Sequence, residues 1–365
     1  MGNKTKIFSI AILLSALIML VSCSQQKTEW KGMVEQENGI TVVKNPKEPM
    51  YGEDVFNLEE ELSIGEAEGR EEYMFSLIWD IEVDDKENIY VVDMKENHIS
   101  KFDKNGGFLR MIGREGQGPG EFQQITNIQI TPENELMVHD RYTFRLTFFS
   151  LDGNYLRTVL LKGIQAFRIK VNSMGNYLVR TIDFDSATLR SATELKVYTS
   201  DLAFIKTIAK DKFRSTEAPL QPWMASKFLP SDLIICGFRE SYEFQILDSE
   251  GKTIRKVLKD YVPIEISEEE KKKRKLPRSS ELPIYFPAFQ DFSVDEEGRI
   301  FVQTYERQID ENKFYYDIFD PEGRYIAKIP LKMKSLSWKK RKLYTIEEDE
   351  DGFQTVKRYK VSWKY

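Results

Sequence analysis

Residue types that build metal and nucleophilic catalytic centres are scarce in this sequence. Its 365 residues include only two cysteines and two histidines. His98 and His139 cannot provide a three-histidine zinc site, and no Cys/His metal motif is present. No Gly-x-Ser-x-Gly motif and no phosphate-cradling loop occur either. The sequence therefore shows no catalytic site, and it favours a binding protein over an enzyme.

An excess of positive charge is also absent. The 53 Lys and Arg residues are outnumbered by 59 Asp and Glu residues, which gives a formal net charge of −6. This balance argues against general nucleic-acid binding, which requires a basic surface. Apolar residues make up 41% of the chain and aromatic residues 12%, which is ample for a hydrophobic core.

The N-terminal segment has the pattern of an export signal. Lys4 and Lys6 precede an apolar run of 15 residues, 7–21, which is too short to span a membrane comfortably. The run ends in Leu20-Val-Ser-Cys23, which resembles the lipobox of bacterial lipoproteins. The resemblance implies that residues 1–22 are a signal peptide and that Cys23 is diacylated, which anchors the protein without spanning the membrane. The alternative is a cysteine that follows a cleaved peptide by coincidence.

Lipidation would affect the rest of the chain in three ways. By the same resemblance, Ser24 rather than Asp after Cys23 implies the outer membrane of a bacterial cell envelope. Loss of Lys4 and Lys6 leaves 51 basic against 59 acidic residues, a net charge of −8. A disulfide within the mature chain is then excluded, and Cys236, in an apolar segment, is interpreted as a small buried residue rather than a reactive thiol.

A repeated unit organises the remaining chain. Each copy is an apolar strand end, a turn that usually carries Asp and Gly, and an alternating strand, which is typical of a β-hairpin. The copies span 102–112, 149–159, 198–208, 247–257 and 319–329. Their starts are 47, 49, 49 and 72 residues apart. A period of about 40–50 residues with several strands per repeat predicts a β-propeller.

The strand count predicts six blades. We expect strands at 77–83, 88–93, 98–102 and 108–112; at 125–130, 136–140, 146–149 and 155–161; at 167–171, 177–180, 195–198 and 204–208; at 224–229, 233–237, 243–247 and 253–258; and at 289–294, 300–304, 315–319 and 325–330. The C-terminal part offers three more, near 335–338, 343–346 and 353–363. A blade needs four, so we expect 55–64 to complete it and close the ring.

The predicted protein is therefore all-β, a six-bladed β-propeller of four-stranded antiparallel blades closed by an N-terminal strand. We expect the propeller over 52–365, after a tether over 23–51 that contains a short strand at 40–43. The interval of 72 residues indicates an insertion between blades, at 259–287.

Two motifs resemble a known family. Gly113-Arg-Glu-Gly-Gln-Gly-Pro-Gly-Glu-Phe122, between two strands, resembles the inter-blade linker of NHL-repeat propellers. Asn88-Ile-Tyr-Val-Val-Asp93 followed by Ile99-Ser-Lys-Phe-Asp103 is similar to the interior of the same repeat. With the lipobox, the chain resembles the TolB-like/NHL-like six-bladed propeller lipoproteins common in Bacteroidetes. The match is clearest over 77–160, and the third and fourth repeats depart from it. This fold hosts sensors, scaffolds, lyases and lactonases, so the resemblance implies no single function.

Loop lengths indicate which face carries function. In a four-stranded blade with strands A to D from the centre outwards, the A–B and C–D turns lie on one face, and here they are short. The B–C loops and inter-blade linkers lie on the other face and are long, at 180–194, 209–223, 259–287 and 303–313. Long loops in a compact domain are usually functional.

Arginine and aromatic residues collect in these long loops. They suit an anionic ligand, a glycan or a protein partner, because guanidinium groups bind carboxylates or phosphates and aromatic rings offer flat apolar surface. The candidate ligand-binding residues are Arg114, Arg141, Arg180, Trp223, Arg239, Tyr285 and Arg307. The alternative for each arginine is a structural one, capping a strand end or pairing with a nearby Asp.

Two further features have open alternatives. Residues 267–275 predict a short helix with Ser267 as N-cap and Glu270 three residues on, either a lid over the channel or a solvated insertion. Asp93 and Asp140 could hold calcium, the one cofactor we consider, because hard oxygen ligands suit it. They also stand where the repeat places a structural Asp at the end of strand B.

The function that these observations favour is a lipid-anchored, extracytoplasmic binding or scaffold module, with its partner on the long-loop face. One alternative is a calcium-dependent, lactonase-like hydrolase or lyase. Another is an accessory subunit of an outer-membrane transport complex.

Overall fold

The computed structural model describes residues 29–188, 190–212, 214–215, 220, 224–229, 232–273, 283–308, 313–332 and 335–365. The chain divides into two compact units, 1–30 and 31–365. Everything below concerns the second unit, which contains every described helix and strand. No helix in the described part is long and apolar enough to cross a membrane.

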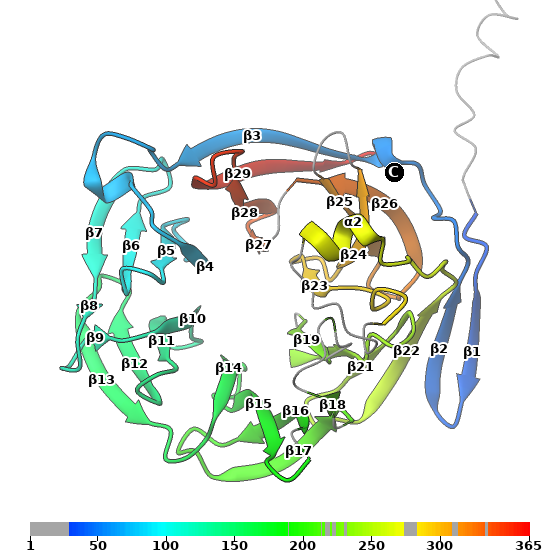
Figure 1. Cartoon of the computed structure of the whole chain (residues 1–365), viewed down its shortest axis with the longest axis horizontal. Helices are drawn as coiled ribbons and strands as arrows, with labels where there is room; N and C mark the ends of the chain where they lie inside the picture. The colour runs from blue at the N-terminus through cyan, green and yellow to red at the C-terminus, as the bar shows by residue number, and fades with distance from the viewer. Residues whose placement is uncertain are drawn as a thin grey trace, which may run out of the picture. The chain divides into compact units, whose positions relative to one another are not determined.

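Six four-stranded sheets surround a central channel, so the predicted six-bladed propeller is confirmed (Figure 1). Blade 1 contains β4 (Ile78–Val83), β5 (Ile89–Asp93), β6 (His98–Phe102) and β7 (Phe108–Ile112). Blade 2 contains β10 (Ile125–Ile130), β11 (Glu135–Asp140), β12 (Arg145–Ser150) and β13 (Tyr155–Leu160). Blade 3 contains β14 (Ala166–Val171), β15 (Tyr177–Asp185), β16 (Arg190–Tyr198) and β17 (Phe204–Lys210).

The other blades continue the pattern. Blade 4 contains β19 (Ala225–Phe228), β20 (Ile234–Gly237), β21 (Glu243–Leu247) and β22 (Thr253–Lys259). Blade 5 contains β23 (Asp291–Val294), β24 (Ile300–Gln308), β25 (Lys313–Phe319) and β26 (Tyr325–Leu331). Blade 6 contains β27 (Ser335–Lys339), β28 (Lys342–Glu348), β29 (Gln354–Trp363) and β3 (Phe56–Ile64).

The N-terminal strand closes the ring, as the strand count predicts. β3 pairs with β29 in antiparallel register from Phe56↔Trp363 to Ile64↔Val356. Closure leaves blade 6 with four strands and joins the two ends of the propeller in one sheet (Figure 1). The arrangement pairs the backbone groups that an open last blade would expose.

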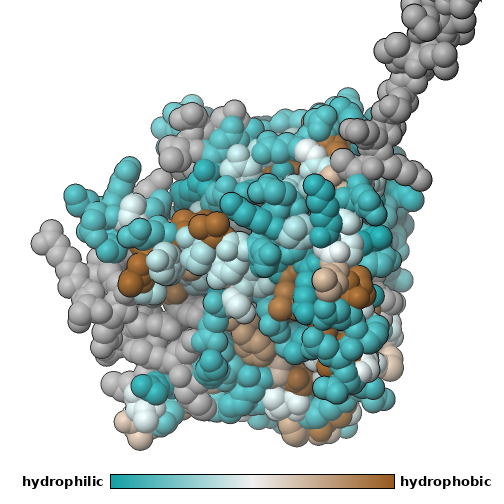
Figure 2. Space-filling model, turned by 90° about the vertical axis from the view of Figure 1, so that its right-hand side faces the viewer, coloured by the Kyte–Doolittle hydropathy of each residue, from teal (hydrophilic) through white to brown (hydrophobic). Residues whose placement is uncertain are grey.

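The hairpin of β1 (Met33–Glu37) and β2 (Ile40–Asn45) extends blade 4 to six strands, which the sequence did not indicate. β2 pairs with β22 in parallel register, from Thr41↔Arg255 to Asn45↔Lys259. The Asn45 amide donates to the Leu258 and Gly323 carbonyls and accepts from the Tyr325 N–H at 2.7 Å. The side of the molecule seen in Figure 2 is mostly hydrophilic, with small separate hydrophobic patches.

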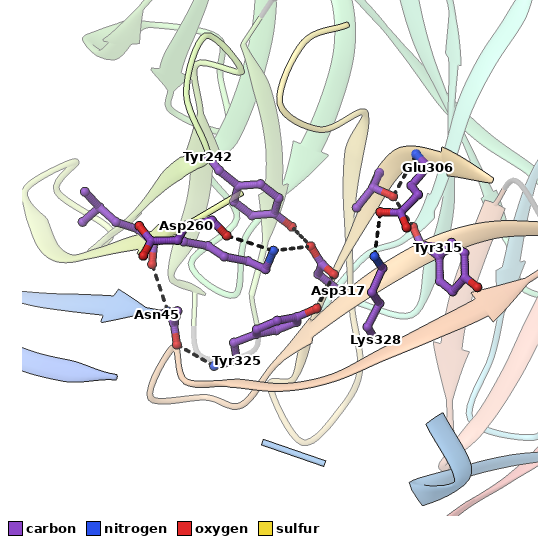
Figure 3. A network of polar contacts seen from close by, with 11 residues as sticks. Asn45, Tyr242, Asp260, Glu306, Tyr315, Asp317, Tyr325 and Lys328 are labelled. Atoms are coloured by element: carbon purple, nitrogen blue, oxygen red, sulfur yellow. Dashed lines mark hydrogen bonds and ion pairs between the residues drawn. The ribbon is translucent and has the colours of Figure 1, made fainter. Parts of the chain in front are cut away.

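A buried polar network joins blade 4 to blade 5 beside this hairpin (Figure 3). Asp317 is 2% exposed and accepts from the hydroxyls of Tyr242 at 2.6 Å and Tyr325 at 2.7 Å. The Lys259 ammonium lies 3.4 Å from the same carboxylate. Tyr242 is therefore an interior residue.

Six short elements lie in the described connections. They are η1 (Glu53–Val55), η2 (Glu71–Tyr73), the parallel pair β8 (Arg114–Glu115) and β9 (Glu121–Phe122), β18 (Arg214–Ser215), and α2 (Glu268–Lys273). Ser267 caps α2 as expected, since its hydroxyl accepts from the Glu270 N–H at 3.2 Å. The Gly-rich segment 113–122 is a linker between blades 1 and 2, as its position between strands predicts.

The turns on one face are uniformly tight. In several of them, one Asp or Asn side-chain oxygen accepts two backbone N–H groups, as Asp103 does from Asn105 and Gly107 at 2.8 Å each. The same arrangement recurs at Asp84, Asn172, Asp248 and Asp295. Hydroxyl groups take this place at Thr131, Ser150 and Thr199. Glycine takes the positive φ position in most of the C–D turns, whereas Leu202 adopts φ +67° in blade 3. We call this side the tight-turn face, and the opposite side the long-loop face.

Candidate functional site

The long-loop face has fewer loops than the sequence indicates. Segments 180–194 and 303–313, expected as loops, are largely strand, and this expectation was wrong. β15 and β16 stay paired to Asp185↔Arg190, and β24 and β25 pair out to Gln308↔Lys313. Both hairpins continue past the neighbouring strands of their blades, because their alternating residues suit a strand as well as a loop. The long connections are 211–224, whose described part includes β18, and 260–290, whose described part includes α2.

A β-bulge recurs at the long-loop end of the innermost strand in blades 1 to 3. The register shifts between Ile78 and Asp80, between Ile125 and Asn127, and between Ala166 and Arg168. A bulge redirects a side chain away from the regular alternation. The bulged residues are Trp79, Thr126 and Phe167, so aromatic rings stand at the channel mouth in blades 1 and 3. The Trp79 indole N–H donates to the Thr126 carbonyl at 3.0 Å.

Two arginines lie over the ring of Phe167. The guanidinium carbons of Arg141 and Arg180 are each 4.8 Å from the ring centroid. The pairs are held by cation–π attraction, which orients each guanidinium plane while leaving its N–H donors available. Neither side chain makes an ion pair or hydrogen bond with another residue in the described ranges. Burial, then the charge of Arg168, lowers the pKa of Arg180 to about 10, so it stays charged at neutral pH.

These residues line two adjoining cavities on the long-loop face. One, of about 350 Å³, lies between blades 3 and 4 and is lined by Arg180, Arg239 and Asp291 among others. The other, of about 700 Å³, lies between blades 2 and 3 and includes Arg141 and Phe144. Both contain Phe167 and Ile182. We call the joined cavities the arginine groove.

The groove combines cationic and flat apolar surface. Tyr142 is 69% exposed, Phe144 47% and Ile182 39%. One Arg239 N–H donates to the Gln290 carbonyl at 2.9 Å, which fixes that side chain at the rim. Asp291 is the one carboxylate among the described lining residues. The groove can therefore bind an anionic group next to an apolar or ring-shaped group.

Three of the seven candidate residues meet in this groove: Arg141, Arg180 and Arg239. Arg114 instead pairs with Glu121 at 2.8 Å in the linker between blades 1 and 2. Arg307 lies over Phe314 on the β24–β25 hairpin, 4.5 Å from the ring centroid. Tyr285 is 50% exposed and bridges to Glu265. Trp223 and Cys23 fall outside the described residues.

Asp93 and Asp140 have matching structural contacts in blades 1 and 2. Asp93 accepts from the backbone N–H groups of Ser76, Leu77, Lys95 and Glu96 at 2.6–3.2 Å. Asp140 accepts from those of Gln123, Gln124, Tyr142 and Thr143 at 2.9–3.2 Å. Positive N–H dipoles surround both carboxylates, which favours the structural role, and calcium binding stays a prediction. The described residues contain no cluster of three His, Cys, Asp or Glu side chains placed to hold a metal.

Cys236 and His139 are interior residues. Cys236 is 1% exposed, and burial raises the pKa of its thiol to about 12, so a thiolate is strongly disfavoured. His139 is 1% exposed, and its Nδ1 lies 3.0 Å from the Thr126 hydroxyl. Burial lowers the pKa of His139 to about 4, so it is neutral at physiological pH.

Sequence reasoning missed Phe167, the residue on which the groove depends. Phe167, Ile169 and Val171 alternate and therefore predict three side chains on one buried face. The bulge after Ala166 breaks that alternation and leaves Phe167 36% exposed, while Ile169 is fully buried. A bulge has no reliable signal in a single sequence, so the alternation misleads at this position.

Comparison with known structures supports the architecture. A candidate exported protein from Bacteroides fragilis superimposes with a TM-score of 0.58 at 12% identity, over 89% of this chain and 100% of that chain. A member of the DUF4221 family from Bacteroides vulgatus gives 0.52 at 12% identity, over 86% and 100%. Virginiamycin B lyase from Staphylococcus aureus gives 0.47 at 9% identity, over 85% and 100%. At these identities the likeness concerns the fold alone.

Comparison with curated proteins gave no match. The family model described as DUF5128, 6-bladed beta-propeller, matches residues 66–353, which covers blades 1 to 5 and two of the four strands of blade 6. The chain belongs to this DUF5128 family of six-bladed β-propellers.

Proposed function

We propose that this protein is a lipid-anchored binding module of the bacterial envelope that binds a carboxylate-bearing ligand in the arginine groove. The observation that carries the proposal is the pair of guanidinium groups over Phe167, neither of which has a carboxylate partner in the described residues. An arginine that is oriented but unpaired has already lost side-chain freedom and keeps its donors for a ligand.

The surroundings of the two arginines favour a saccharide or peptide carrying the carboxylate. The exposed rings of Tyr142 and Phe144 offer flat surface for a sugar ring or a peptide side chain. The groove is also long, because its two cavities adjoin at Phe167 and Ile182. An acidic oligomer would place successive carboxylates at Arg141 and Arg180.

The envelope location rests on the sequence of residues 1–24. The export pattern and the lipobox-like Leu20–Cys23 support acylation at Cys23 and attachment to the outer membrane. The likeness to a candidate exported protein is compatible with this location. Radiolabelled palmitate incorporation into the wild-type chain, and its loss in Cys23→Ala, would test the anchor.

Titration calorimetry with a glutamate oligomer and a galacturonate oligomer tests ligand binding. Arg141→Ala/Arg180→Ala should weaken binding by at least about tenfold, and added salt should weaken wild-type binding. Arg114→Ala is the matched control, because Arg114 is paired with Glu121 outside the groove. Failure of both oligomers to bind, or an equal loss in Arg114→Ala, would overturn the proposal.

A second function, an accessory subunit of a transport complex, is favoured by exposed apolar residues elsewhere on the same face. Phe184 is 53% exposed, Val262 63% and Ile284 67%. Exposed apolar side chains that gather on one face suit a protein interface. A complex that co-purifies with the wild-type chain and is lost in Phe184→Ser/Ile284→Ser, but kept in Arg141→Ala/Arg180→Ala, would favour this function over ligand binding.

A further inference from the structure

The central channel has a second cavity at its opposite end. It measures about 450 Å³, and its lining includes the last residues of several innermost strands: Ile130 of β10, Val171 of β14, Val294 of β23 and Trp338 of β27. Those strand ends point toward the tight-turn face, away from the arginine groove. We call this space the tight-turn cavity.

Three cations project into this cavity from neighbouring innermost strands. Arg168 and Lys170 are two residues apart on β14, so they share its channel-facing side, and Lys227 lies on β19. None of the three side chains makes an ion pair or hydrogen bond with another residue in the described ranges. Burial, then the charge of Arg168, lowers the pKa of Lys227 to about 8, so it is mostly protonated at neutral pH.

The carboxylates that line the cavity do not balance these cations. Asp232 accepts from the Ser173 N–H and hydroxyl. Glu82 lies on β4, and burial raises its pKa to about 7, so it carries only part of a negative charge at neutral pH. Two more carboxylates line the adjoining middle of the channel, where Asp80 accepts from the Ile128 N–H and Asp291 from the Phe292 N–H. Arg180 also lines the cavity, so its wall carries four cationic side chains against Asp232 and the partly ionised Glu82, which leaves an excess of positive charge.

The rest of the wall is apolar. Leu178 and Leu195 belong to the second and third strands of blade 3, so the cavity reaches outward from the channel between blades 3 and 4. Leu229 and Leu336 add aliphatic surface, and the Trp338 indole N–H is already used by the Ser293 hydroxyl at 3.1 Å. The cavity thus has a cationic side and a separate aliphatic side.

We propose that the tight-turn cavity binds a small amphipathic organic anion, a monocarboxylate with an aliphatic body. The carboxylate would lie at Arg168, Lys170 and Lys227, and the aliphatic chain would lie between Leu178 and Leu195. A volume of about 450 Å³ is in the usual range for small-molecule sites, roughly 300–1,000 Å³. Binding would add a carboxylate in direct contact with the three cations, none of which forms an ion pair with a described side chain. Arg180 lines both this cavity and the arginine groove, but the three cations that would bind the carboxylate are absent from the groove, so the proposal does not depend on the function proposed for the groove.

Calorimetry with octanoate as the probe tests this site, using residues 29–365, which include all six blades and their closing strand. Octanoate should bind, whereas octylammonium, with the same chain and opposite charge, and acetate, with the same charge and no chain, should bind at least about tenfold more weakly. Lys227→Met should weaken octanoate binding by about tenfold or more, and Lys227→Arg should retain it. Removal of one unpaired cation should not lower the unfolding temperature.

Arg141→Met separates the two sites, because Arg141 lines the arginine groove and is absent from the tight-turn cavity. It should leave octanoate binding unchanged. The proposal is overturned if octanoate fails to bind the wild-type chain at millimolar concentration, if octylammonium binds as well as octanoate, or if folded Lys227→Met keeps wild-type affinity. Equal weakening by Arg141→Met would also overturn it, since binding would then lie on the other face.

Discussion

The two ends of the central channel differ although the same six innermost strands form both. At the long-loop end, the guanidinium groups of Arg141 and Arg180 lie over the partly exposed ring of Phe167. At the tight-turn end, Arg168, Lys170 and Lys227 line a cavity beside leucine side chains. Bulges and extended hairpins shape the first end, and hydrogen-bonded Asp turns shape the second. One repeat therefore yields two cavities with different linings, one with exposed rings beside arginines and one with leucines beside a cluster of cations.

The largest expected effect comes from opening the ring of blades, on which both sites depend. A chain beginning at Gly65 lacks β3, so β29 becomes an unpaired edge and blade 6 keeps three strands. We expect loss of cooperative unfolding and of both binding activities, because closure holds blade 6 against blade 1. Circular dichroism melts and calorimetry would measure this.

A chain beginning at Pro46 is the matched comparison. It loses β1, β2 and the Asn45 contacts but keeps every blade and the closing strand. It should unfold cooperatively at a lower temperature and retain both sites. Equal behaviour of the two shortened chains would mean that β3 does not close the propeller.

The next effect concerns the contact between blades 3 and 4, which enclose the tight-turn cavity. Gly251, in a turn at φ +76°, packs on Ile208, and an added Cβ would meet its Cγ2 and lie 3.3 Å from its Cα. Gly251→Ala should lower the free energy of unfolding by about 3 kcal/mol through clash and strain. Gly175→Ala has similar strain at φ +75° but open space around the new atom, so about 1 kcal/mol is expected. Urea unfolding would compare the two, and equal losses would contradict tight packing at Gly251.

The parts of this architecture that follow local rules were predictable from sequence. The Asp103–Gly107 turn pattern gives the repeat, and three C-terminal strands require a fourth, which Phe56–Ile64 provides. Ser267 caps its helix because capping depends on residues within one turn.

The candidate sites were less predictable, because they depend on contacts between distant segments. Arg141 and Arg180 were identified by residue type, yet only the bulge at Phe167 brings them together. Arg168, Lys170 and Lys227 alternate with apolar residues, as solvated positions would, and the closed ring turns them toward a cavity. The Tyr242 hydroxyl donates to Asp317, which lies 75 residues later in another blade.

Acidification should lower the free energy of unfolding through His139, which lies near the long-loop end. The pKa of His139 is about 4 in the folded protein and about 6.5 when unfolded, so the unfolded state takes up a proton that the folded state excludes. The contribution of His139 to the free energy of unfolding, about 3 kcal/mol, is fully present above pH 6.5 and is lost as the pH falls toward 4. His139 contacts Thr126, the bulged residue of blade 2.

The measurement is urea unfolding at pH 7 and pH 4.5 for the wild type and His139→Gln. The difference between the two proteins isolates His139 from the many carboxylates that also titrate. The variant should lose less stability on acidification than the wild type. Parallel losses would show that His139 does not carry the effect.

The smallest expected effect is a difference between the two sites in how ligand affinity depends on pH. Between pH 6 and 8.5 the carboxylates of octanoate and of the glutamate oligomer stay ionised. At the tight-turn cavity, Glu82 gains negative charge through its pKa of about 7, and Lys227 loses positive charge through its pKa of about 8. Asp80, Lys170 and Lys339 act on the Glu82 carboxyl, but burial is the dominant cause of its raised pKa. Octanoate should therefore bind several-fold more weakly at pH 8.5, by roughly 1 kcal/mol.

Binding at the arginine groove should not follow this trend, because Arg180 remains protonated with a pKa of about 10. In Glu82→Gln, the decline in octanoate affinity between pH 6 and 7.5 should flatten, while the decline above pH 8 remains with Lys227. If the affinities for octanoate and for the glutamate oligomer instead fall in parallel as the pH rises, the two sites do not differ in the pKa values of their charged groups. A flattened octanoate profile beside an unchanged oligomer profile would mean that Glu82 and Lys227 make binding pH-dependent at the tight-turn cavity alone, while the arginines keep their charge at the groove.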